Sequence, residues 1–201
     1  MKFIILFLLI GSGFAQWGHN VTISGTKETI QQDAATNALT TIGYEHHEVH
    51  SGSHFTFSMD STVGDADTLG FLIVTPNTTK WAHMVFDVIG ALDTRFDLFE
   101  TSTHTAGMER TAYNNNRNST STNTTQIFNW TRGVSDGTAI FRSHFGVDTG
   151  LGASRVTGGG SVRGASEFIL KQNTKYFFAI TSATAANVIS MKLTWYEHTD
   201  K

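Results

Sequence analysis

The stretch that decides the fold is 188-VISMKLTW-195, close to the end of the chain. Apolar residues occupy every second position of it, namely Ile189, Met191, Leu193 and Trp195. Successive side chains of a β-strand point to opposite faces, so this period of two predicts a strand with one face against a core.

The same period recurs along most of the chain. Tyr176, Phe178 and Ile180 are spaced by two, and the segment SATAAN at 182–187 predicts a loop joining this strand to 188–195 as a hairpin. The run FLIV at 71–74 is typical of a strand buried on both faces. Further strands are predicted near 55–59, 84–88, 96–98, 126–130, 138–145 and 167–170. Roughly eight to ten strands at this spacing predict an all-β fold, an antiparallel sandwich or barrel.

The length of 201 residues fits one domain with an N-terminal extension. A basic residue, an apolar run and small residues in succession predict a secretion signal at 1–15, cleaved before Gln16. A buried or membrane-touching segment and a misplaced start codon are the alternatives. Residues 16–40 carry a weak core signal and are expected to form an N-terminal arm, and 41–201 a single sandwich domain. The polar tract YNNNRNSTSTNTT at 113–125 predicts a surface loop.

The composition excludes several classes of function. Charged residues make up only 15% and the formal charge is −3, so the chain lacks the clustered basic charge expected of a nucleic-acid-binding protein. The absence of cysteine excludes disulfides, thiolate zinc sites and thiol nucleophiles. No G-x-S-x-G elbow is present. We assign no catalytic residue and no cofactor, and expect a protein that is not an enzyme.

The segment 44-YEHHEVHSGSH-54 holds four of the nine histidines. If it is a strand, His46, Glu48 and His50 share one face and could bind a divalent metal ion, within one chain or among three copies around a symmetry axis. The alternative, which the sequence favours, is a polar framework strand whose histidines hydrogen-bond to their neighbours. A third hypothesis is a metal-dependent enzyme centred on His46, His47, His50 and His54.

Aromatic side chains are the candidates for a ligand-binding surface. In a carbohydrate-binding module, Tyr113 and Trp130 would stack on sugar rings, with Trp81 and Tyr196 as further candidates. Core packing is the alternative for these residues. This hypothesis describes a secreted, extracellular module for carbohydrate binding or adhesion, whose partner would be a cell-surface glycan.

Five blocks of the sequence resemble, in order, a family of uncharacterised bacteriophage virion structural proteins frequent in marine and other environmental viruses. They are 44-YEHHEVHSGSHF-55, 74-VTPNTTKWAHM-84, 114-NNNRNS-119, 167-EFILKQNTKYFFAITS-182 and 193-LTWYEHTD-200, and the resemblance covers about residues 38–201. It implies a β-sandwich of the jelly-roll kind at the virion surface, as a capsid decoration, head fibre or tail-associated protein. It also implies homotrimers and contacts with other virion proteins. A secretion signal departs from this pattern, because phage virion proteins assemble inside the host.

Overall fold

The computed structural model describes residues 43–145, 156–159 and 167–199. Its contacts divide the chain into two units, Met1–Ile42 and Gly43–Lys201. Every helix and strand described below belongs to the second unit. The expected secretion signal at 1–15 and N-terminal arm at 16–40 lie outside the described residues.

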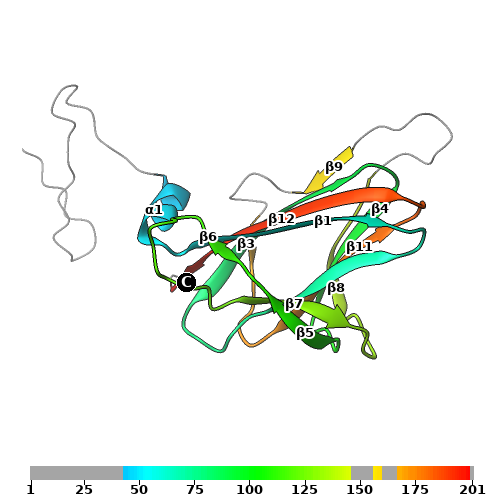
Figure 1. The fold of residues 1–201 in the computed structure, drawn as a ribbon. Helices are drawn as coiled ribbons and strands as arrows, with labels where there is room; N and C mark the ends of the chain where they lie inside the picture. The colour runs from blue at the N-terminus through cyan, green and yellow to red at the C-terminus, as the bar shows by residue number, and fades with distance from the viewer. Residues whose placement is uncertain (1–42, 146–155, 160–166, 200–201) are drawn as a thin grey trace, which may run out of the picture. The chain divides into compact units, whose positions relative to one another are not determined.

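The second unit consists of two antiparallel sheets and one short helix (Figure 1). The helix is α1 (Tyr44–Ser51). The first sheet, here called the β12 sheet, contains β10 (Phe168–Ile169), β3 (Trp81–Gly90), β12 (Asn187–His198), β1 (His54–Val63) and β6 (Tyr113–Asn114) in this order, with β9 (Val156–Gly159) also paired to β3. The second, the β11 sheet, contains β5 (Thr105–Arg110), β7 (Gln126–Thr131), β2 (Thr68–Val74), β11 (Lys175–Ser182), β4 (Thr94–Glu100) and β8 (Thr138–Phe145).

The connectivity is that of a jelly roll. Strands β5, β6 and β7 form an insertion between β4 and β8, while β9 and β10 both pair with β3 and act as one interrupted strand. Of the eight strands that remain, the first, eighth, third and sixth form one sheet, and the second, seventh, fourth and fifth form the other. Two interlocked Greek keys give this order. The predicted all-β sandwich is confirmed, and the insertion explains why the strands outnumber the prediction.

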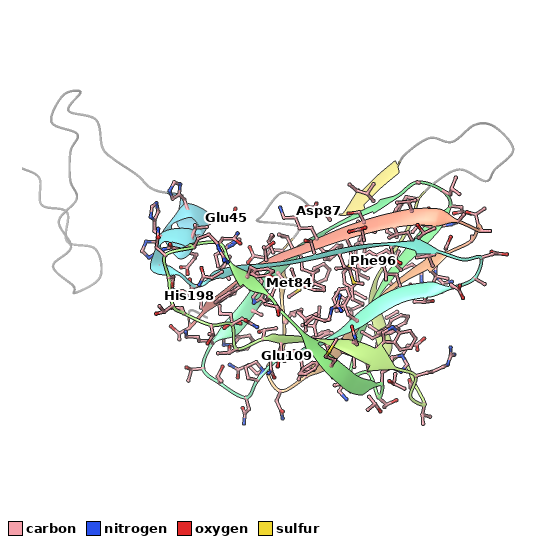
Figure 2. The ribbon with its side chains drawn as sticks, in the orientation of Figure 1. Glu45, Met84, Asp87, Phe96, Glu109 and His198 are labelled. Carbon is pink, nitrogen blue, oxygen red and sulfur yellow. The ribbon has the colours of Figure 1, made fainter. Side chains whose placement is uncertain are left out.

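The core lies between the two sheets and is rich in phenylalanine. Phe178 of β11 is fully buried at its centre, with its ring 4.7 Å from Phe71 and 4.3 Å from Phe96. Phe86 of the β12 sheet packs edge-on against Phe96 across the interface, at 4.7 Å. Figure 2 shows Met84 and Phe96 in this interior, each from a different sheet. Burial of one such side chain stabilises the fold by about 1.5–3 kcal/mol.

The predicted burial patterns of two strands are confirmed. In β12 the four apolar residues of alternating positions are at most 2% exposed, whereas Ser190 and Lys192 between them are exposed. In β2 both faces are covered: Phe71 and Ile73 belong to the main core, and Leu72 to a second cluster with Phe177 on the outer face of the β11 sheet.

The hairpin predicted at the C-terminal end is wrong. Strand β11 pairs with β2 and β4, whereas β12 pairs with β1 and β3, so the connection at 183–186 crosses from one sheet to the other. The fully buried Asn187 holds the crossing: its Oδ1 accepts the Leu92 N–H at 2.9 Å, and its Nδ2 donates to Thr94 Oγ1 at 2.9 Å and Ser182 Oγ at 3.1 Å. Alternation identifies the inward face of a strand but does not identify its partner.

The strand predicted at 44–54 is also wrong, because residues 44–51 form α1 and β1 begins only at His54. The helix ends at Gly52, whose φ of 76° is left-handed; Gly52 N–H donates to Val49 O, and Ser53 N–H to Glu48 O, both at 3.1 Å. This is the Schellman arrangement. Polar residues fill nearly every position of 44–54, so the segment has no alternation of apolar and polar residues that could distinguish a strand from a helix. Within the described part of the chain, no helix is long and apolar enough to cross a membrane.

Candidate functional site

A polar cavity of about 290 Å³ lies where α1, the 113–125 loop and the end of β12 meet. Figure 2 shows Glu45 of α1 and His198 of β12 at this same end of the sandwich. The lining is polar except for Phe55, and consists of His47, Glu48, Ser51, Gly52, Ser53, Phe55, Lys80, Ser121, Thr122, Glu197, His198 and Thr199. Two carboxylates, two histidines and a lysine thus line one small cavity.

Glu48 lines this cavity, and both of its carboxylate oxygens have partners. The side chain is 3% exposed, and its Oε2 accepts a short hydrogen bond from Ser53 Oγ. Its Oε1 lies 3.8 Å from His198 Nε2, within ion-pair distance. The carboxylate is therefore held between Ser53 and His198 at the wall of the cavity.

Glu197, by contrast, is fully engaged in holding the polar loop. The carboxylate is 4% exposed and accepts the N–H groups of Thr124 at 2.9 Å and Thr125 at 2.7 Å, and the Thr124 hydroxyl at 2.6 Å. The indole N–H of Trp195 adds a fourth donor at 3.2 Å. Because charge-assisted bonds to backbone N–H groups are among the stronger hydrogen bonds, Glu197 fixes the loop to β12.

Asparagines of the tract 113–125 hold the loop against α1 beside the cavity, which Ser121 and Thr122 of the same tract line. Asn114 is buried, and its Nδ2 donates to Gly52 O at 2.7 Å and to Ser121 O at 3.1 Å. Asn116 Nδ2 donates to His50 O at 3.1 Å, which ties the end of α1 to the same loop. The tract is a surface loop as predicted, yet its amides hold it in one conformation. Composition alone gave no signal for these contacts.

The metal-binding set predicted from the sequence is only partly assembled. The helix places His46 and His50 on one exposed face, with their Nε2 atoms 2.7 Å apart. Glu48 is buried and bonded to Ser53, so it does not join them. The strand register that would have aligned the three residues does not exist here. Among the described residues, no three histidine, aspartate or glutamate side chains are grouped as metal ligands.

The remaining histidines of the proposed metal enzyme are also separated. His54 is 2% exposed, and its Nδ1 and Nε2 lie near Asn115 Nδ2 at 2.7 Å and Glu45 Oε1 at 3.4 Å respectively. His47 lines the cavity instead. The framework role expected as the alternative fits His54, although it sits at the start of β1 and not within a strand 44–54.

The structure places the two main aromatic candidates for ligand binding, Tyr113 and Trp130, on different sheets. Tyr113 is 55% exposed and carries the Arg117 guanidinium 5.4 Å from its ring. Trp130 packs against Phe177 at 4.6 Å and His104 at 4.9 Å, covering the second apolar cluster. Of the further candidates, Tyr196 is buried and Trp81 is partly buried.

Two other buried titratable side chains hold loops and strands in place. Asp97 is 1% exposed and pairs with Arg95 at 2.7 Å and with Arg142 on the neighbouring strand. His104 is equally buried, and its Nδ1 accepts the Gly133 N–H at 2.8 Å while its Nε2 lies 2.9 Å from Asp136 Oδ1. Among the described residues, no serine or threonine hydroxyl is hydrogen-bonded to the Asp97 carboxylate or to the His104 imidazole.

Comparison of the chain with protein-family models, with curated proteins and with solved structures found no match.

Proposed function

We propose that this protein is a non-enzymatic structural protein of a virion surface, in the role of a capsid decoration, head fibre or tail-associated component. It works as a homotrimer in contact with other virion proteins, and presents its polar loops outward. The virion assignment rests on the five sequence blocks that resemble phage structural proteins. The structural support comes from the way in which the buried polar groups are used.

The observation that carries this proposal is that buried titratable side chains are used to hold loops and strands in place. Glu197 fixes the 113–125 loop, Asp97 joins neighbouring strands through two arginines, and His104 holds the turn at Gly133. An enzyme of this size would be expected to keep some such groups free for proton transfer. In a protein that displays loops at a particle surface, the same buried groups are instead used to keep the polar loops rigid.

Exposed apolar side chains support assembly with other protein surfaces. Ile89, Ile169 and Val188 lie on the β12 sheet and are 41%, 57% and 53% exposed. Ile89 and Val188 lie side by side, together with Ala91, and adjacent exposed apolar side chains favour burial against a partner. A second copy of the chain or another virion protein fits this requirement.

The polar cavity favours a second candidate, a secreted carbohydrate-binding or adhesion module. Its hydroxyl, carboxylate and ammonium groups match the donors and acceptors of a sugar, and its volume of about 290 Å³ suits one monosaccharide residue. The absence of an exposed aromatic ring from its lining weighs against strong stacking.

One experiment separates the two candidates. Quantitative mass spectrometry compares purified particles with cell-free medium from the producing culture, and light scattering gives the mass of the purified full-length chain. We expect a fixed stoichiometry relative to other virion proteins, and a trimer in solution. Recovery of the protein only as a free species in the medium, with its N-terminus at Gln16, would contradict the virion role and support secretion.

A further inference from the structure

The exposed face of α1 carries two imidazoles one helical turn apart. His46 and His50 are four residues apart, a spacing that places side chains next to each other on a helix. Their rings are stacked with centroids 4.6 Å apart and planes 13° apart, and the Nε2 atoms are 2.7 Å apart within hydrogen-bonding geometry. A neutral imidazole has one donor and one acceptor nitrogen, so one Nε2 donates to the other. The two nitrogens are therefore directed at each other.

The C-terminal end of α1 is fixed to the rest of the unit. The carboxylate of Glu48 is buried against Ser53, and the Schellman turn at Gly52 ends the helix with hydrogen bonds to the carbonyl oxygens of Glu48 and Val49. Asn116 donates to the carbonyl oxygen of His50 at 3.1 Å. The backbone at His50 is thus fixed, which reduces the entropy lost when its imidazole binds a ligand.

We propose that His46 and His50 chelate one Cu²⁺ ion per chain through their Nε2 atoms. On binding, the imidazole that donates in the hydrogen bond moves its proton from Nε2 to Nδ1, and both rings turn so that their Nε2 lone pairs meet at the ion. For a metal–nitrogen bond of about 2.0 Å, adjacent ligands at 90° lie about 2.8 Å apart and tetrahedral ligands about 3.3 Å apart. The observed 2.7 Å matches the first arrangement, which is the geometry that Cu²⁺ and Ni²⁺ prefer. Cu²⁺ binds nitrogen ligands most tightly of the divalent first-row ions.

The remaining coordination positions are filled by water. In the described part of the chain no third histidine, aspartate or glutamate joins the pair as a ligand. His47 belongs to the same short helix but lines the polar cavity, whereas the stacked and hydrogen-bonded pair consists of His46 and His50. The site therefore differs from the cavity and does not depend on the proposed virion role.

The test titrates the full-length protein with Cu²⁺ alone, in a buffer containing glycine as a weak competitor that suppresses binding to isolated histidines. Calorimetry gives the stoichiometry, and electron paramagnetic resonance shows nitrogen hyperfine splitting from the ligands. We expect the wild-type protein to bind one equivalent more than either His46→Ala or His50→Ala. The matched control His47→Ala removes a histidine of the same helix and should keep that equivalent.

Each outcome decides the proposal. Loss of the equivalent in both single variants, with retention in His47→Ala, supports a chelate of two imidazoles. Retention in either His46→Ala or His50→Ala, or loss in His47→Ala as well, overturns it. The proposal is also overturned if the wild-type protein binds no more Cu²⁺ than a double variant that carries both His46→Ala and His50→Ala. Since both residues are exposed and alanine favours helices, circular dichroism should show all variants folded.

Discussion

Tyr176 shows how a single buried polar group links the core to the pH of the solution. Its ring is 1% exposed, and its hydroxyl accepts the Lys171 N–H at 2.8 Å and donates to Glu100 Oε2 at 3.2 Å. Burial raises the pKa of the phenol well above its usual range, and the negative charge of Glu100 raises it further, against the opposing effect of the Lys171 N–H. The folded state therefore holds the neutral phenol at a pH where the unfolded chain ionises.

This pKa shift predicts a loss of stability in alkaline solution. The unfolded tyrosine releases its proton near pH 10, whereas the folded one keeps it, so the free energy of unfolding is unaffected below that pH and falls as the pH rises above it. In Tyr176→Phe the decline between pH 9 and 12 should be shallower than in the wild type. Urea unfolding followed by fluorescence across this range measures it.

Tyr113→Phe is the control, because that hydroxyl is already exposed to solvent. It should follow the wild-type curve. At pH 7 Tyr176→Phe should itself be less stable by about 1 kcal/mol, through loss of its hydrogen bonds. Parallel curves for the wild type and Tyr176→Phe above pH 10 would show that Tyr176 does not carry the effect.

At the level of elements, one carboxylate couples the 113–125 loop to the last strand. Glu197 lies on β12 and accepts bonds from Thr124 and Thr125, whose N–H groups would otherwise be buried without partners. An unsatisfied buried donor costs about 1–3 kcal/mol. The loop therefore forms one side of the polar cavity only while this contact holds.

Replacing Glu197 should release the loop. Glu197→Ala is expected to lower the free energy of unfolding by about 2–4 kcal/mol, because two N–H groups and a hydroxyl lose their acceptor. Glu197→Gln should be milder than Glu197→Ala, because its Oε1 can still accept the N–H groups of Thr124 and Thr125 and its Nε2 can donate to the Thr124 hydroxyl. Hydrogen exchange at the amides of Thr124 and Thr125 reports the local effect, and urea unfolding the global one.

Glu109→Ala provides a matched surface change in the insertion, because Glu109 is exposed on β5 and its Oε1 accepts a hydrogen bond from Nε2 of the partly buried Gln126 at 3.2 Å. Its effect should stay within about 0.5 kcal/mol. Unchanged protection of Thr124 and Thr125 in Glu197→Ala would mean that other contacts hold the loop.

The elements that sequence analysis predicted correctly are those with one apolar face. The period of two located β1, β3, β11 and β12, because burial against the opposite sheet imposes it. Two kinds of feature were not predictable in this way. The partner of β11 depends on Asn187, a single polar residue whose bonds reach Leu92 and Thr94 far along the chain. The helix α1 ends at the left-handed backbone angle of Gly52, and its polar residues are distributed around all sides of the helix. It therefore has no apolar face from which a helix could be predicted.

The candidate site was predictable only as a list of residue types. The sequence drew attention to the histidines at 44–54 and the asparagines at 113–125, and the structure brings these two segments together. Glu48 and Glu197 were not singled out for the roles that they play, because nothing in their local sequence indicates burial. A carboxylate at 3% or 4% exposure depends on donors supplied by other segments.

At the scale of the whole molecule, the jelly-roll order makes the last strand, β12, central to the fold. Strand β12 occupies an interior position of its sheet and pairs along its length with β1 on one side and β3 on the other. It contributes four side chains that are at most 2% exposed: Ile189, Met191, Leu193 and Trp195. Residues Met1–Ile42 form the other unit of the chain.

Two truncations should therefore behave in opposite ways. The fragment 43–201 should keep the near-ultraviolet dichroism and the cooperative unfolding of the full chain. The fragment 1–186 should lose both, because four buried side chains at about 1.5–3 kcal/mol each approach or exceed the 5–15 kcal/mol that stabilises a typical domain. Lys192→Ala, an exposed change within β12, should leave unfolding within about 0.5 kcal/mol of the wild type and controls for disturbance of the strand itself. Cooperative unfolding of fragment 1–186 would show that the sandwich does not need its last strand, and a non-cooperative fragment 43–201 would show that residues 1–42 help to hold the two sheets together.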